Sequence, residues 1–199
     1  MCKWKIEKVI ILPFGGLTIF KENINKPLKE ELFILLMGPI FQIIFTYFYR
    51  NNDVILNYSN IILFFNLLPI YPLDGSKILN IILNIFLSFK KSHIITIYIS
   101  FFTIILFLIK EKFNIIIIFI MSFIFVKLIF ELKNHNDIFN RFLLERYIHN
   151  IHFKKTKIIR SPNLYKMKRD YKHIFYNQKR YITEKEILKK RFDFHSKTW

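Results

Sequence analysis

Four apolar stretches, each about as long as a membrane-spanning helix, constrain this chain more than any other feature of its sequence. They lie at about 31–49, 54–73, 93–109 and 113–130. A helix needs roughly 20 apolar residues to cross the hydrocarbon core of a bilayer. The short connector at 110–112 makes the last two stretches an antiparallel helical hairpin. The sequence therefore predicts a mainly α, polytopic helical membrane protein with about four transmembrane helices.

Charge divides the chain into a membrane body and a basic tail. Residues 131–199 hold 18 basic and 7 acidic side chains, and thus supply +11 of the net charge of +17. Basic residues in short loops gather on the side of the N-terminus, which indicates that this end and the tail are cytosolic. We expect a membrane-associated hairpin and linker at 1–30, a transmembrane domain at 31–133 with a broken helix at 66–75, and a small basic α/β tail at 134–199.

Before the first apolar stretch, the sequence alternates β-branched and polar residues around a Pro-Phe-Gly-Gly turn. This pattern at 5–20 predicts two short strands joined by a turn at Phe14, Gly15 and Gly16. Such a hairpin is equally consistent with a purely structural amphipathic edge and with a role in the function of the protein.

The second apolar stretch is interrupted by polar residues and prolines. Pro69 and Pro72 each remove a backbone donor and push the preceding residue out of helical geometry. Irregular backbone at membrane depth survives only where protein or a wet cavity surrounds it, and an ionisable residue there, Asp74, is a functional candidate. Two alternatives remain open. Asp74 also fits an N-cap for a helix at 78–89, and Asn66 fits a packing contact between helices.

The pattern N-x-x-P-x-x-P-L-D-G at 66–75 resembles the second signature of the site-2 proteases, which are intramembrane zinc metalloproteases, and above all that of their sporulation branch. Three further stretches, at 10–16, 26–39 and 141–147, resemble other segments of that branch in the same order. The resemblance covers about residues 6–147. It implies a bacterial cell or forespore membrane as the location.

The resemblance also implies roles for individual residues. Asp74 would be the third zinc ligand. The hairpin would help to guide an extended segment of the substrate. The residues that inherit a role in positioning the substrate or shaping the site are Asn66, Pro69, Pro72, Phe14, Gly15 and Gly16.

The other two zinc ligands of this family are the histidines of H-E-x-x-H, whose glutamate is the general base. That motif does not occur among the 199 residues, and the first histidine is His93. A catalytic zinc site needs three protein ligands. We therefore expect that an N-terminal part carrying the motif is missing, and that this chain alone binds no zinc stably and cleaves no peptide.

The tail mixes basic and aromatic residues. This composition fits a segment that contacts anionic lipid headgroups, a segment that contacts nucleic acid, or a small soluble module whose surface is rich in lysine. Strand-like pieces at 172–176 and 180–183 before a helix at 184–191 loosely resemble part of a nucleotide-binding regulatory module. We expect membrane lipid and a membrane-protein substrate as partners, such as the pro-sequence of a membrane-bound transcription factor, and no nucleic acid. The alternatives are a non-catalytic scaffold or client-binding pseudoprotease, and a small polytopic transporter.

Overall fold

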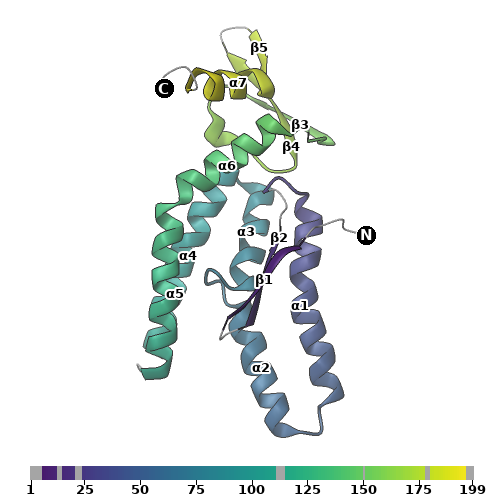
Figure 1. The fold of residues 1–199 in the computed structure, drawn as a ribbon, viewed down its shortest axis with the longest axis vertical. Coiled ribbons are helices and arrows are strands. Elements are labelled where there is room, and N and C mark those ends of the chain that lie inside the picture. Colours follow the sequence, from purple (N-terminus) through teal and green to yellow (C-terminus); the bar gives the residue numbers. More distant parts are fainter. Residues whose placement is uncertain are drawn as a thin grey trace.

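The computed structural model describes residues 6–12, 15–20, 24–110, 115–149, 151–177 and 180–195. The described chain is mainly helical. Five helices form an elongated group, and a sixth leads to a small module at one end of it (Figure 1). These helices are α1 (Leu28–Phe48), α2 (Asp53–Leu67), α3 (Asp74–Phe86), α4 (Phe89–Lys110), α5 (Ile115–Lys133) and α6 (His135–Ile148).

The predicted N-terminal hairpin is confirmed. Strands β1 (Ile6–Leu12) and β2 (Gly15–Phe20) pair antiparallel, with Leu12 opposite Gly15 next to the turn. Phe14, to which the resemblance gives a role, lies outside the described residues.

Among the described residues, α1 and α4 are long and apolar enough to cross a membrane. Large apolar side chains on them face outward, for example Phe41 and Phe48 on α1 and Phe102 on α4. A soluble protein rarely exposes so many in one continuous area. Helices α4 and α5 pack against each other, as the predicted helical hairpin requires.

The second predicted crossing is divided between two helices. Helix α2 has only 15 residues and is about 22 Å long, which is shorter than the ~30 Å hydrocarbon core. Figure 1 shows α3 continuing beyond α2, toward the same end of the helical group as the tail. The helix expected at 78–89 in fact begins at Asp74 and ends at Phe86. The stretch predicted as the second crossing thus consists of α2, an irregular segment at 68–73, and α3.

Helices α4 and α5 share a buried core, and the irregular segment belongs to it. Ile70 and Leu73 pack there with side chains from α4 and α5, including Ile97, Met121 and Leu128. The break in the helix is therefore held inside the protein and is not a loop on its surface.

We call residues 151–195 the tail module. It contains a three-stranded sheet in the order β3-β4-β5, in which β3 and β4 are parallel and β4 and β5 antiparallel. The predicted strands and helix of the tail are confirmed, and β3 and η1 were not predicted. The elements are β3 (Lys155–Ile159), η1 (Leu164–Lys166), β4 (Tyr171–Asn177), β5 (Arg180–Thr183) and α7 (Glu184–His195).

A second buried core joins the tail module to the helical group. Phe175 of β4 and Leu188 of α7 pack with Phe139 and Phe142 of α6 and with Phe89 at the start of α4. Because Phe89 and Phe142 stack with their ring centroids 4.3 Å apart, α6 connects the two parts through packing as well as through the chain.

Candidate functional site

The irregular segment at 68–73 keeps most of its backbone hydrogen-bonded. Within the segment, the Ile70 amide donates to the carbonyl oxygen of Leu68 at 2.7 Å, and the Leu73 amide donates to that of Ile70 at 2.8 Å. Short-range bonds of this kind replace the helical bonds that the two prolines remove. The prolines themselves, Pro69 and Pro72, are half-buried.

Ser100 of α4 supplies the remaining partners. Its Oγ accepts a hydrogen bond from the Tyr71 amide at 3.1 Å, and its hydroxyl hydrogen is shared between the Thr96 carbonyl oxygen at 2.9 Å and the Pro69 carbonyl oxygen at 3.1 Å. Ser100 is buried. A buried backbone group without a partner would cost about 1–3 kcal/mol, so this serine stabilises the conformation of the irregular segment.

Gly75 allows α3 to start directly against the end of α2. A Cβ atom at this position would lie 2.1 Å from the Leu67 carbonyl oxygen and 2.4 Å from that of Leu68. Real Cβ atoms essentially never approach other atoms within 3.0 Å. Only glycine therefore fits at this junction, and the close approach fixes the position of the preceding residue, Asp74.

The carboxylate of Asp74 lies between α3 and α1. Its Oδ1 pairs with Nζ of Lys77 at 3.2 Å, and its side chain is 36% exposed. Its Oδ2 lies 3.9 Å from where a Cβ on Gly38 of α1 would be. Gly38 and Pro39 carry part of the resemblance described above, so two stretches that are distant in the sequence meet at this carboxylate. The expected N-cap role is wrong, because Leu73 holds the cap position and no side chain caps the helix.

The side chains around Asp74 do not by themselves fit a zinc ion. Within the described ranges, no three His, Cys, Asp or Glu side chains cluster closely enough to hold a metal. A stable zinc site needs at least three such ligands, and one oxygen of Asp74 is already paired with Lys77. Further ligands would have to come from outside this group.

The other residues expected at the site fall into two groups. Asn66 lies half-buried in the last turn of α2, next to the irregular segment and on the same chain segment as Asp74. Gly15 and Gly16 begin β2, opposite Leu12 and Ile11 of β1. The structure thus places Asp74 beside Gly38, with Asn66, Pro69 and Pro72 on the chain segment that leads to Asp74.

A polar cluster on the other side of the irregular segment was not predicted. The carboxylate of Glu131 on α5 interacts with the phenol of Tyr71, and Nε2 of His93 in α4 lies 3.4 Å from Oε1 of the same carboxylate. The side chains of His93 and Glu131 are mostly buried. His93 and Glu131 stand near the ends of apolar stretches, which is the signal in the sequence that could have identified them.

Residues 167–170, which we call the junction segment, hold the tail module against the start of α1. Arg169 pairs with Glu31 at 2.6 Å. Both carboxylate oxygens of Asp170 accept from the Leu28 amide, at 3.2 and 3.3 Å. This amide is one of the donors that a helix leaves unpaired at its N-terminus, so the tail module caps α1.

The junction segment also contacts the next two helices. Nζ of Lys168 donates to the carbonyl oxygen of Phe86 at the end of α3. The Met167 carbonyl accepts from the Phe89 amide at 3.0 Å, where α4 begins. Four consecutive residues therefore bind the ends of three helices, and the pattern of apolar residues in the sequence gave no indication of this.

A buried guanidinium lies beneath the junction segment. The side chain of Arg146 on α6 is only 1% exposed and pairs with Glu184 of α7 at 3.0 Å. It also donates to Asn25 Oδ1 at 2.6 Å and to the Lys168 carbonyl oxygen at 2.9 Å. Burial raises the pKa of Glu184, but its hydrogen bond with His173 and the charge of Arg146 outweigh this effect and hold that pKa below its usual value.

His173 completes this network in its neutral form. Its Nε2 accepts from the Lys168 amide at 3.0 Å, and its Nδ1 lies 3.2 Å from a Glu184 oxygen. The proton therefore resides on Nδ1. Burial lowers the pKa of His173 below 6.5, which favours the same neutral tautomer.

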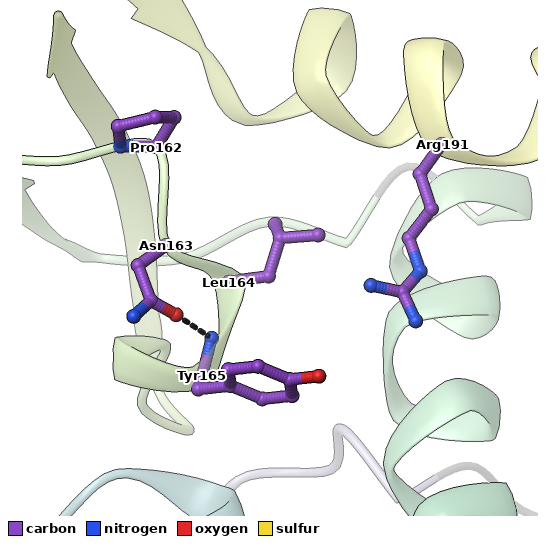
Figure 2. A pocket seen from close by; sticks show the side chains of 5 residues that line it. All are labelled: Pro162, Asn163, Leu164, Tyr165 and Arg191. Carbon is purple, nitrogen blue, oxygen red and sulfur yellow. Dashed lines mark hydrogen bonds between the residues drawn. The ribbon is translucent and has the colours of Figure 1, made fainter.

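The tail module carries an open depression of about 370 Å³ on its surface. Figure 2 shows Tyr165 and Leu164 on one side of it and the guanidinium of Arg191 from α7 on the other. Arg191 donates to Oδ1 of Asn140 on α6 at 2.9 Å. The groups that line the depression come from η1, its preceding turn and α7, and none of them is a carboxylate.

Comparison with known proteins gives one informative result. No family model matches the sequence. The chain is 34% identical over 159 residues to stage IV sporulation protein FB of Bacillus subtilis (strain 168), an alignment that covers 72% of this chain and 55% of the relative. The chain thus spans little more than half the length of the curated relative that it matches.

Proposed function

Because this chain belongs to the site-2 protease family, we propose that it forms the later part of the membrane domain of an intramembrane zinc metalloprotease and contributes Asp74 to the metal site. One observation carries the proposal. A carboxylate stands at the end of a proline-broken crossing, beside Gly38 of α1. A charged group in such a place is retained for function. The substrate would be a membrane-embedded or juxtamembrane segment of another protein, such as the pro-sequence of a membrane-bound transcription factor.

The irregular segment would position that substrate. A peptide must be extended before it can be hydrolysed, and extended backbone at membrane depth needs polar partners. Asn66 can both donate and accept hydrogen bonds, while Pro69 and Pro72 keep the nearby backbone from forming a helix. Gly15 and Gly16 of the hairpin, with Phe14, are proposed to guide the same segment.

Four crossings follow from this proposal: α1, α2 together with α3, α4, and α5. The beginning of α1 and the tail module lie at the same end of the helical group (Figure 1), as an even number of crossings requires. Basic loop residues favour a cytosolic location for both.

By itself the 199-residue chain is proposed to be inactive, because it carries one of the three required ligands and has no H-E-x-x-H sequence. The test compares this chain with a version preceded by a membrane segment that carries the motif. Zinc per chain and cleavage of a membrane-tethered peptide are measured for both. We expect zinc and cleavage only in the extended version.

The variant Asp74→Asn, made in the extended version, should lose zinc and cleavage. The matched control is Asp53→Asn, which removes an exposed carboxylate at the start of α2, and it should retain both. Cleavage by the 199-residue chain alone, or by the Asp74→Asn variant, would show that the site is assigned wrongly.

A second candidate is a client-binding relative without catalytic activity. The ion pair between Lys77 and Asp74 favours it, because Lys77 provides a counter-charge for the carboxylate in the absence of any metal. The two candidates differ in one result. A client-binding protein would retain a membrane-tethered peptide on co-purification, and the extended version would leave that peptide uncleaved.

A further inference from the structure

A small pocket of about 180 Å³ lies where α1, α3 and the tail module meet. Its wall combines apolar side chains, among them Leu32 of α1 and Ile81 of α3, with the polar residues Lys29, Asn84 and Lys155. It is separate from Asp74, and nothing in the proposed peptidase site uses it.

Polar and apolar groups occupy different levels of the pocket. Lys29 stands in the first turn of α1 and Asn84 near the end of α3, both at the ends that face the tail module. Leu32 and Ile81 lie about one turn farther into the helices. The part of the pocket farther into the helices is thus lined by apolar groups, whereas its end beside the tail module combines Lys29 and Asn84 with the apolar Leu28 and Ile85.

The rim of the pocket carries an excess of positive charge. Lys29 and Lys155 are exposed, and in the described parts of the chain no carboxylate forms a salt bridge with either. The one carboxylate at the rim, Asp170, is bound to the Leu28 amide. Two lysines at a membrane surface attract an anionic headgroup, by about 1 kcal/mol each.

A buried acceptor in the pocket has no donor. Asn84 is 1% exposed. Its Nδ2 donates to the Asn80 carbonyl oxygen at 2.8 Å, but its Oδ1 has no hydrogen-bond partner. Buried polar atoms are nearly always hydrogen-bonded. The oxygen therefore calls for a ligand that brings a donor such as a hydroxyl, which a choline group lacks.

From these three features together, we propose that the pocket binds the headgroup of a phosphatidylglycerol molecule from the leaflet beside the tail module. Its phosphate lies between Lys29 and Lys155, and a glycerol hydroxyl donates to Oδ1 of Asn84. The acyl chains extend along Leu32 and Ile81 into the bilayer. A volume of about 180 Å³ is below the roughly 300 Å³ of a pocket for a whole small molecule, and so suits a headgroup alone.

The test reconstitutes the full chain in nanodiscs of phosphatidylcholine containing one part in ten of a second lipid. That lipid is phosphatidylglycerol in one sample and phosphatidic acid, which has no glycerol hydroxyl, in another. Lipid retained per chain after mild detergent extraction is measured by native mass spectrometry. We expect retention of phosphatidylglycerol above phosphatidic acid, and of both above phosphatidylcholine.

Lys29→Gln and Lys155→Gln should each weaken retention of phosphatidylglycerol about fivefold, which corresponds to about 1 kcal/mol per lysine. Lys91→Gln, which removes an exposed lysine at the start of α4 that does not line the pocket, should leave retention unchanged. Asn84→Leu should reduce phosphatidylglycerol to the level of phosphatidic acid.

Three results would overturn the proposal. They are equal retention of phosphatidylcholine, an equal loss in Lys91→Gln, and displacement of the lipid by free glycerol 3-phosphate, which would identify a site for soluble phosphates. None of these readouts involves zinc or cleavage, so they are independent of the role proposed for Asp74.

Discussion

Replacing Gly75 by alanine tests the packing that places Asp74. The new Cβ atom would lie 2.1 Å from the Leu67 carbonyl oxygen, about 0.9 Å inside the closest approach that such atoms show. Because the obstructing atoms belong to the backbone, the ends of α2 and α3 must separate. Overpacking of this kind costs about 1–3 kcal/mol, and a rigid neighbour favours the upper end of that range. For a chain of this length, ~3 kcal/mol lowers the melting temperature by about 6–12 °C.

Gly38→Ala is the matched control. The Cβ atom at this position meets only Asp74 Oδ2, at an ordinary contact distance of 3.9 Å, and alanine is favoured over glycine inside a helix by about 1 kcal/mol. We therefore expect a melting temperature that is unchanged or raised by about 2–4 °C. Both variants are heated in detergent micelles and followed by far-ultraviolet circular dichroism. A Gly75→Ala protein as stable as the parent would refute the packing derived for the junction of α2 and α3.

Four further predictions concern stability, each checked by the same thermal unfolding. Ser100→Ala should cost about 1–3 kcal/mol, because it leaves the part-buried Tyr71 amide without an acceptor, whereas Ser122→Ala, which removes an exposed hydroxyl, should cost little. Asp74→Asn should change stability by less than about 1 kcal/mol, since its ion pair is about one-third exposed; a larger loss would mean that the carboxylate is retained for folding. Glu184→Gln should cost about 3–5 kcal/mol by leaving a buried guanidinium unpaired. The parent should lose stability as the pH falls below about 6.5, because the lowered pKa of His173 means that the unfolded chain binds the proton first. The loss of stability should continue below about pH 4.5, because the folded pKa of Glu184 is also lowered and the unfolded chain takes up that proton first. A melting temperature that stays constant between pH 8 and 5 would contradict the neutral form of His173.

The sequence identified the parts of the fold that depend on local chemistry. The Gly-Gly turn predicted the hairpin, and the spacing of Pro69 and Pro72 predicted the broken crossing, because proline acts on its own backbone and its neighbour. The N-cap expected at Asp74 failed for a tertiary reason. Packing of Gly75 against α2 makes α3 begin one residue earlier than capping preferences indicate.

Contacts between distant segments could not be predicted in this way. The spacing of apolar residues does not relate Gly38 to Asp74, and no residue pattern in the tail indicates that the junction segment caps α1. The buried network around Arg146 was likewise hidden in a segment that reads only as basic, since charge counts do not distinguish a paired, buried arginine from an exposed one.

The cap on α1 has a consequence for the way this protein is made. Asp170 and the amide that it caps are separated by 142 positions, so α1 is synthesised long before its cap. Domains generally fold as units and in the order of synthesis. The N-terminus of α1 therefore acquires this cap only after residue 170 has left the ribosome, and a chain that stops before that residue would leave the Leu28 amide without its side-chain acceptor.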